Sequence, residues 1–325
     1  MARAFLFLRA GISLFFQSPI SVFLAKTLHI YILRIYMYFL GFFYYSLKRN
    51  ECRRIKQGIR YFQTMRADSS QLKAVFLFYK TLSGIFEHYL EKLVMAYRPL
   101  SKLLYYFDKR LTISSRRVLD DAYNSNKGVI LVTGHFGAVE FLPMALFLKG
   151  YKVAMICKFK TSALKQELAS RAKERNITLI DGAEPGVAIK ALKAIKDGCV
   201  LITECDEFKE WRLGCEKIDV LGQTVNSDKT LEIFYKKAKV PTMLGLMRRD
   251  TKGRYTLCIE ALADGKEKVT IAKVAWKKLE NYIHRYPEQW YQWADFSKLI
   301  LDNCVNDTED SHIPVTNTIS AANYS

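Results

Sequence analysis

The chain has 325 residues, with 50 Lys and Arg against 32 Asp and Glu, and a formal net charge of +18. This length allows a sizeable hydrophobic core and does not require two equal domains. The excess of basic residues implies an anionic partner, such as nucleic acid, anionic lipid or an acidic carrier protein. The seven cysteines include no Cys-x-x-Cys pair, and the five histidines show no metal-ligand spacing. We therefore expect no disulfide framework, no metal site and no bound cofactor.

Residues 1–50 contain no Asp or Glu, and isolated basic residues separate apolar stretches that are rich in Tyr and Phe. Because these aromatic residues favour the bilayer interface, we expect a membrane-anchoring helical segment. Residues 27–47 reach the ~20 residues of a spanning helix only with Arg34 inside the span. A pair of interfacial helices broken near Pro19 fits equally well, so both interpretations stay open.

A basic run follows the apolar segment, namely Lys48, Arg49, Arg53, Arg54, Lys56 and Arg60. Positive residues beside a membrane segment stay on the cytoplasmic side, so we expect the rest of the chain there. These charges lie beside membrane-seeking sequence and are not spread along one nucleic-acid-binding module. The sequence therefore argues against nucleic acid as the partner.

Periodicity predicts a long amphipathic helix over residues 69–97 and, from residue 114, helices that alternate with short apolar runs. The first of these helices stops before residue 126. We predict strands at 129–133, 151–157, 177–180 and 199–203, and helices at 138–148, 162–175 and 185–196. This succession indicates an α/β fold with a mostly parallel central sheet flanked by helices.

The later part of the chain predicts a helix at 229–239, strands at 241–247 and 255–260, and a Lys-rich helix at 267–285. We expect these strands to extend the sheet, some of them antiparallel. The sequence after residue 301 is polar and predicts a mobile tail. The expected organisation is an anchoring segment at 1–50, an α/β domain at 51–301 and a tail at 302–325.

The Gly-His-Phe-Gly segment at residues 134–137, here called the His box, follows the first predicted buried strand. This is the usual location of ligand chemistry in open α/β sheets. Gly134 and Gly137 lack a Cβ, which permits a tight turn and close approach of a substrate. The start of the next helix disfavours a positive charge on His135 and favours a developing oxyanion. His135 is therefore the expected general base.

Two carboxylates are candidate partners of this histidine. Glu140 lies in the first turn of the predicted helix, where it could orient His135 and stabilise the cation formed on proton uptake. Asp206 ends a strand at the same sheet edge, between Glu204 and Glu207, in a cluster that can raise one pKa. The alternative is that His135 is an ordinary turn residue and Glu140 an ordinary carboxylate at a helix start, because their spacing is a weak signal.

The His box followed by Glu140 resembles the Gly-His-x-Gly-x-x-Glu box of the bacterial late acyltransferases of lipid A biosynthesis, within the lysophospholipid acyltransferase superfamily. The Pro-Glu-Gln-Trp segment at residues 287–290, here called the closing stretch, is similar to that family's closing signature. The layout between Cys205 and Arg248 is also similar. The resemblance covers most of residues 27–300.

This resemblance implies an enzyme at the bacterial inner membrane that moves a fatty acyl chain from a thioester to a hydroxyl of a lipid A precursor or related lipid. The donor would be acyl carrier protein or coenzyme A, with His135 as base and Glu140 as its partner. Such a transfer needs no metal if a base takes the hydroxyl proton and donors hold the oxyanion. The family usually has Asn-Trp where this chain has Ala138 and Val139, and Asp-Gln at residues 206–207, so the acceptor stays open.

Lys158, Lys160 and Arg171 are candidates for binding phosphate or orienting the acyl group, and the alternative is a solvated basic face. A competing function is a non-catalytic basic peripheral protein that binds anionic lipid or carrier protein, which does not explain the His box. A serine hydrolase is excluded because no Gly-x-Ser-x-Gly elbow follows a strand. We expect Trp290 to pack the wall of the site and His88 to be structural.

Overall fold

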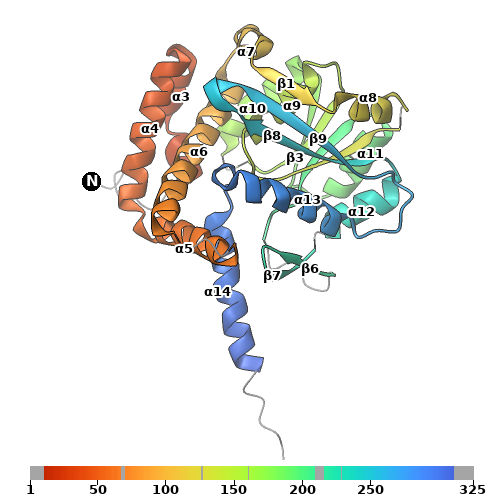
Figure 1. Cartoon of the computed structure of the whole chain (residues 1–325). Helices are drawn as coiled ribbons and strands as arrows, with labels where there is room; N and C mark the ends of the chain where they lie inside the picture. Colours follow the sequence, from red (N-terminus) through yellow and green to blue (C-terminus); the bar gives the residue numbers. More distant parts are fainter. Residues whose placement is uncertain are drawn as a thin grey trace, which may run out of the picture.

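The computed structural model describes residues 11–66, 70–125, 127–159, 161–208, 216–227 and 229–310 (Figure 1). Its first part is helical, with α2 (Ile12–Phe16), α3 (Pro19–Thr27), α4 (Ile30–Leu47), α5 (Arg49–Met65), α6 (Gln71–Tyr97) and α7 (Leu100–Asp108). The helix predicted at residues 69–97 is confirmed as α6. Helix α6 packs against α3, α4 and α5 and joins them to the rest of the fold.

The strands of the central sheet are β1 (Leu111–Ser114), β2 (Val129–Thr133), β3 (Val153–Cys157), β4 (Ile177–Asp181), β5 (Val200–Glu204), β8 (Thr242–Arg249) and β9 (Tyr255–Ala263). Their order is β1-β9-β8-β2-β5-β3-β4. Strands β2, β3, β4, β5 and β8 run parallel, whereas β9 pairs antiparallel with β8 and parallel with β1. The predicted mostly parallel sheet is confirmed, and so is its antiparallel addition.

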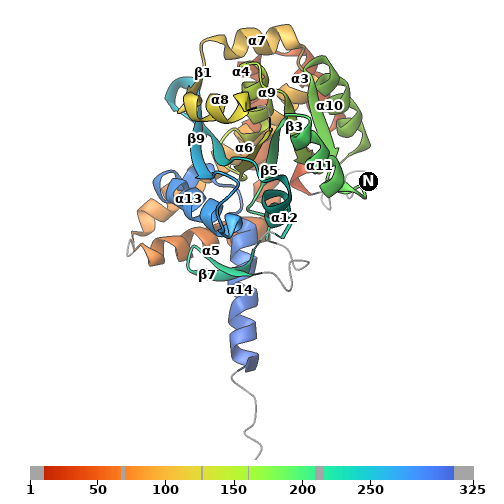
Figure 2. The ribbon, with the colours of Figure 1, turned by 90° about the vertical axis from the view of Figure 1, so that its right-hand side faces the viewer.

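The remaining elements are α8 (Arg116–Asn124), η1 (Val139–Phe141), α9 (Leu142–Phe147), α10 (Ser162–Glu174), α11 (Val187–Lys196), β6 (Lys217–Val220), β7 (Gln223–Asn226), α12 (Lys229–Ala238), η3 (Thr251–Gly253), α13 (Ile271–Arg285), η4 (Pro287–Gln289) and α14 (Trp293–Asp310). Helix α11 packs on β3, β4 and β5, and α13 packs on β8 and β9. Figure 2 shows the sheet with helices around it and the β6–β7 hairpin below.

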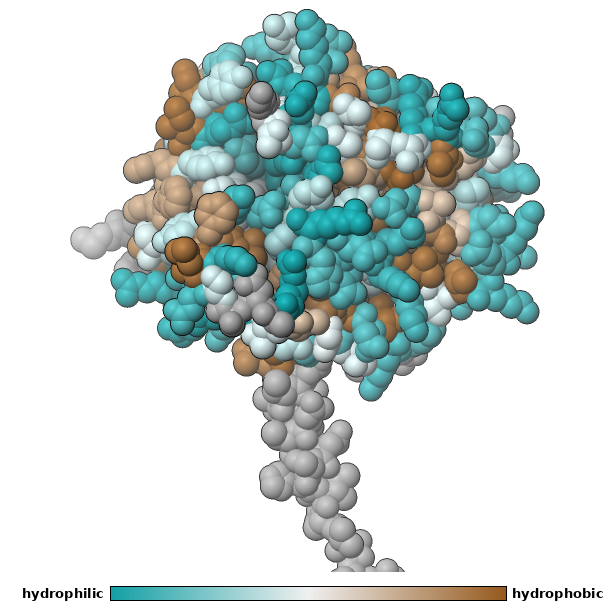
Figure 3. All heavy atoms as spheres, viewed as in Figure 1, coloured by the Kyte–Doolittle hydropathy of each residue, from teal (hydrophilic) through white to brown (hydrophobic). Residues whose placement is uncertain are grey.

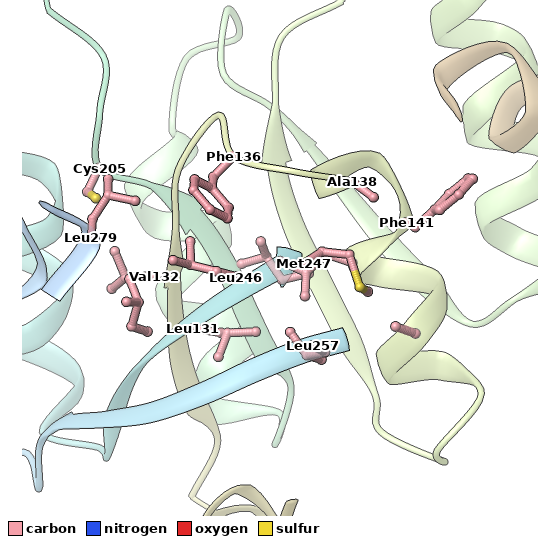
Figure 4. Close-up of a cluster of buried hydrophobic side chains, with 14 of the residues drawn as sticks. Leu131, Val132, Phe136, Ala138, Phe141, Cys205, Leu246, Met247, Leu257 and Leu279 are labelled. Carbon is pink, nitrogen blue, oxygen red and sulfur yellow. The ribbon is translucent and has the colours of Figure 1, made fainter. Parts of the chain in front are cut away.

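Apolar side chains fill the space beneath the His box. Every residue of β2 is buried, as expected for a central strand covered on both faces. Figure 4 shows Phe136 turned back toward Val132 and Leu246, so the tip of the turn is fixed to the core. This packing holds the neighbouring His135 at the carboxyl edge of the sheet.

Two predicted boundaries differ in the structure. The helix predicted at residues 138–148 is divided into η1 and a short α9, because the Ala138 N–H donates to a β8 carbonyl and Pro143 lies in the first turn of the α-helix. The tail predicted from residue 302 is helical up to Asp310, as part of α14. Residues 311–325 lie outside the described residues.

Helix α4 packs one face on α6 and exposes the other. Gly41 lies so close to α6 that an added Cβ would meet the Phe86 ring at 2.3 Å. Arg34, the only charged residue of α4, forms an ion pair of 2.7 Å with Glu87 of α6. Residues 27–47, which one of the two interpretations takes as a single span, are interrupted at residues 28–29, between α3 and α4.

The exposed face of α4 is apolar and includes Ile32, Ile35 and Phe39. Figure 3 shows apolar side chains along the left edge of the molecule, over α3 and α4. Among the helices of the described part of the chain, α4 is the one that is long and apolar enough to cross a membrane. A buried core helix or an N-terminal signal sequence meets the same criteria of length and composition.

Candidate active site

Main-chain hydrogen bonds hold the turn that carries His135. The Gly137 N–H donates to the Gln289 carbonyl at 2.8 Å, and the Ala138 N–H donates to the Met247 carbonyl at 2.7 Å. The N–H groups after Gly137, which include that of Ala138, were expected to be free at a helix start and to stabilise an oxyanion. The Ala138 N–H is instead used to dock the turn on β8, and the Gly137 N–H docks it on the closing stretch.

The closing stretch lies directly against the His box. The His135 carbonyl accepts a hydrogen bond of 3.0 Å from the Tyr291 N–H, and Phe136 and Trp290 form an antiparallel bridge. The Tyr291 hydroxyl also donates to the Gly137 carbonyl. The two motifs that are far apart in the sequence therefore form one structural unit.

The two glycines of the His box make room for atoms of the protein itself. Gly137 has a φ of +56°, and an added Cβ would lie 2.0 Å from the Met247 carbonyl oxygen. An added Cβ on Gly134 would lie 3.0 Å from Asp206 Oδ2 and 3.0 Å from a Leu279 methyl. The role of these glycines in binding substrate stays a prediction, whereas their role in close packing follows from these distances.

Asp206 is the carboxylate that holds the imidazole of His135. Its Oδ1 lies 2.8 Å from His135 Nδ1, and its Oδ2 accepts hydrogen bonds of 2.8 Å from the His135 main-chain N–H and from the Trp290 indole N–H. The Asp206 side chain is fully buried. Trp290, which was expected only to pack the wall, therefore also fixes this carboxylate.

This arrangement decides which nitrogen of His135 can act as a base. A carboxylate accepts hydrogen bonds only, so Nδ1 carries the proton that is shared with Asp206. The side-chain amide nitrogen of Gln292 lies 2.9 Å from His135 Nδ1, on the same side of the ring as Asp206. The other ring nitrogen, His135 Nε2, lies 3.5 Å from Glu204 Oε2. In the neutral ring it has the free lone pair, so it is the atom that can accept a proton.

Glu140 faces α6. Its Oε1 lies 2.8 Å from Lys92 Nζ and 3.6 Å from His88 Nε2. The orientation of His135 that was expected from Glu140 is thus provided by Asp206, because η1 turns the Glu140 side chain toward α6. Glu140 and His135 line the same cavity, so a catalytic role of Glu140 stays a prediction.

Carboxylates around His135 favour its protonated form. Burial lowers the pKa of His135, but the charges of Glu204, Asp206 and Glu207 outweigh this effect and raise the pKa to about 10. The helix start was expected to keep the ring neutral, and this expectation is not met because three carboxylates act in the opposite direction. Burial also raises the pKa of Glu204.

His135 opens into a cavity of about 740 Å³ between the sheet edge, α6, α10 and α11. One face of α10 lines it with Leu164, Leu168, Ala172 and Arg175. At ~1.5 Å per residue this face is about 16 Å long. Because α10 connects the end of β3 to the start of β4, the cavity extends from the His135 edge of the sheet toward the opposite edge.

The predicted basic residues take different places. Lys158 lines the cavity and pairs with Glu207 at 2.8 Å. Arg171 lies on α10 and pairs with Glu167 and Glu174 at 3.3 Å each. Arg171 is not among the described residues that line the cavity, and Lys160 lies outside the described residues.

A buried ion pair anchors the closing stretch from the other side. Arg249 Nε and one terminal nitrogen contact the two Glu91 oxygens at 2.7 and 2.6 Å. The Gln289 amide bonds the main chain of Arg249 in both directions, at 2.8 and 3.0 Å. Arg249 therefore joins α6, β8 and the closing stretch behind the site.

The sequence did not identify His88, Lys92, Glu204 and Gln292 as site residues, although all four line the cavity. His88 is buried, and burial, Lys92 and Arg249 hold its pKa well below the usual range. The available signal was on α6, where His88 and Lys92 are four residues apart and so share one face of this amphipathic helix. Among the described residues, no group of three His, Cys, Asp or Glu side chains is placed to hold a metal ion.

The fold and the site together define a class: an α/β protein with a histidine held by a buried carboxylate at the carboxyl edge of a mostly parallel sheet. The sequence model of the bacterial lipid A biosynthesis acyltransferase family matches residues 101–294, which contain both the His box and the closing stretch. The chain belongs to this family, and membership indicates an acyltransferase of the lipid A type. A comparison with individual curated proteins gives no match.

Proposed function

We propose that the protein is a membrane-associated O-acyltransferase that moves a fatty acyl chain from a thioester to a hydroxyl of a lipid A precursor or related membrane lipid. The observation that carries this proposal is the placement of His135, which lines the cavity with Nδ1 bound to Asp206 at 2.8 Å and Nε2 beside Glu204. The donor thioester is on acyl carrier protein or coenzyme A, and no resident cofactor takes part.

In the proposed reaction the lipid hydroxyl oxygen attacks the thioester carbonyl carbon while its proton passes to His135 Nε2. The tetrahedral intermediate then collapses, the carbon–sulfur bond breaks, and the proton from His135 reaches the leaving thiolate. Asp206 keeps the ring oriented and stabilises the imidazolium that forms. Lys92, paired with Glu140 at 2.8 Å, lines the cavity and is our candidate for contact with the developing oxyanion.

The carboxylates near His135 change the strength of the base. A raised pKa makes neutral His135 a stronger proton acceptor, because Glu204 and Asp206 stabilise the product cation. The same effect leaves less neutral histidine at low pH. The proposed enzyme therefore gains activity as pH rises through the neutral and alkaline range.

The apolar part of the cavity is suited to the acyl chain. Ile156 and Leu179 from the sheet and Leu164 and Leu168 from α10 line it, and Arg175 lies at the far end of the α10 face. Arg175 donates to the Met95 and Arg98 carbonyls at 3.3 and 3.4 Å, at the end of α6. A polar group in this position closes an apolar chamber and limits the length of the bound chain.

Membrane attachment is proposed to occur through the outer face of α3 and α4, on the cytoplasmic side of the inner membrane. The exposed Ile35 and Phe39 are suited to the acyl boundary of a bilayer, and basic residues follow at the start of α5. The Arg34–Glu87 ion pair and the close contact at Gly41 keep the other face of α4 on α6. These contacts favour an interfacial helix over a spanning one.

The proposal is tested by an acyl transfer assay on membranes, with a panel of lipid acceptors and acyl donors. We expect His135→Ala to abolish transfer, and Glu140→Ala in the same assay tests the predicted second carboxylate. His284→Ala is the matched control, because the His284 side chain is more than a third exposed, and among the described residues its ion-pair partner is Glu280 at 3.8 Å. Full activity of the His135 variant would contradict the mechanism. Absence of transfer by the parent chain with every donor and acceptor would instead favour a non-catalytic lipid-binding protein.

A further inference from the structure

A second cavity, of about 980 Å³, lies between the α3–α4 junction, the end of α6, and α7. Five basic side chains line it, namely Arg98, Lys102, Lys109, Arg110 and Arg254, against one acidic side chain, Asp108. We call this cavity the basic pocket. Among the described residues, none of these five has a carboxylate within ion-pair distance. The pocket therefore carries an excess of positive charge that the protein itself does not neutralise.

The deepest of these groups is Arg98. Its side chain is largely buried and donates to the Leu28 carbonyl at the end of α3, and burial lowers its pKa. A buried guanidinium without an anion carries an unfavourable desolvation cost, which a bound anion removes. The Arg110 guanidinium lies 4.8 Å from the centre of the Tyr106 ring, so it is held at the pocket wall.

The border of the pocket is apolar and faces the same side as the proposed membrane surface. Tyr31 of α4 and Tyr105 of α7 line it and are 56% and 85% exposed. Ile32 and Leu104, next to these tyrosines, are also exposed. Tyrosine at the boundary between apolar and charged residues is typical of a membrane interface. A soluble anion would require the charges but not this apolar border.

The basic pocket is distinct from the reaction cavity, because the two share no lining residue. Helix α6 separates them, with His88 and Met95 toward the reaction cavity and Val94 and Arg98 toward the basic pocket. Along α6, His88 and Arg98 are about 15 Å apart at ~1.5 Å per residue. Figure 1 shows α3 and α4 beside α6 and α7 just beyond its C-terminal end, all away from α13.

We infer that the basic pocket binds the phosphate of an anionic phospholipid headgroup when the apolar face of α3 and α4 lies on the bilayer. Arg98, Lys102 and Arg110 supply the charge that recognises the phosphate, and Tyr31 and Tyr105 lie at the level of the glycerol. This site is used for attachment and orientation, so its occupation does not depend on the acyl transfer reaction.

The test is co-sedimentation of the full chain with phosphatidylcholine vesicles that contain or lack phosphatidylglycerol. The variant Lys102→Ala/Lys109→Ala changes two exposed side chains that make no described ion pair. With two basic residues lost near an anionic surface, binding to phosphatidylglycerol vesicles should weaken about 30-fold. Binding to pure phosphatidylcholine should change little.

The matched control is Lys193→Ala/Lys196→Ala, which removes the same charge from exposed positions on α11. If the control loses as much binding as the pocket variant, general charge and not the pocket explains the attachment, and the inference is wrong. The inference is also wrong if the pocket variant binds like the parent chain. A third arm adds inorganic phosphate: complete competition at low concentration would assign the pocket to a soluble anion and overturn the lipid assignment.

Discussion

The indole N–H of Trp290 donates a hydrogen bond of 2.8 Å to Asp206 Oδ2, while Oδ1 of the same carboxylate lies 2.8 Å from His135 Nδ1. The closing stretch thus acts on His135 through one buried carboxylate. Because Trp290 and Asp206 are both fully buried, this chain of hydrogen bonds excludes water and has one geometry. It links the two family motifs by a physical contact.

The first prediction is that Asp206→Asn lowers kcat about a thousandfold. The asparagine amide offers an N–H group where Oδ1 now accepts, so Nδ1 loses its partner or the ring takes the other tautomer. Single-turnover acyl transfer with a saturating donor measures this loss. Glu140→Gln is the comparison, and a larger loss in that variant than in Asp206→Asn would show that the sequence spacing, and not the observed contact, identifies the partner.

The fold was largely predictable where periodicity is strong. Strand β2 has the predicted bounds of residues 129–133, and the long helix at 69–97 is present as α6. Strand β1 was not predicted, because it has four residues and alternates partly buried with exposed positions at the edge of the sheet. In the described part of the chain its partner is β9, which is far away in the sequence, and such pairing leaves no local signal.

The site was predictable only in part. His135 stands out because the flanking glycines and the preceding strand are local features. The choice between Glu140 and Asp206 depends on the direction in which η1 turns, which in turn depends on hydrogen bonds from Gly137 and Ala138 to distant carbonyls. The sequence around Glu140 contains no sign of these distant carbonyls. The five-residue spacing from His135 therefore indicated Glu140, which in the structure pairs with Lys92.

Gly137→Ala should destabilise the protein strongly. The new Cβ would lie 2.0 Å from the Met247 carbonyl oxygen, and the φ of +56° is itself unfavourable for alanine. We expect a loss of about 3 kcal/mol or more in the free energy of unfolding. Gly186→Ala is the control, because its φ is +78° but nothing lies within 4 Å of the added atom. It should lose only about 1 kcal/mol in denaturant unfolding, and equal losses would contradict the role of the Met247 contact.

The pH dependence of kcat/KM tests the carboxylate cluster. Negative charge on Glu204 is the largest of the effects that raise the pKa of His135 to about 10. Glu204→Gln removes this charge, so the pKa falls and the acid limb of the profile should move to lower pH. Glu207→Gln should move it less, because Glu207 has the smallest of the named effects. An acid limb that does not move in the Glu204 variant would mean that a different group titrates.

The length of the apolar chamber should set the preferred acyl chain. Ala172 is buried on the α10 face that lines the cavity, one turn before Arg175, so Ala172→Phe fills the far end of the chamber. Each methylene that no longer fits costs about 0.8 kcal/mol, which is about fourfold in kcat/KM. Competition between donors of graded chain length, with the products read by mass spectrometry, should show a shift toward shorter chains.

Ala169→Phe is the control for this shift, because Ala169 lies on the same helix but is exposed and does not line the cavity. It should leave the product distribution unchanged. If Ala172→Phe lowers activity equally for all chain lengths, the chamber does not hold the acyl chain, and the cavity beside α10 binds the acceptor instead. That result would reverse the assignment of donor and acceptor while leaving His135 and Asp206 in their roles.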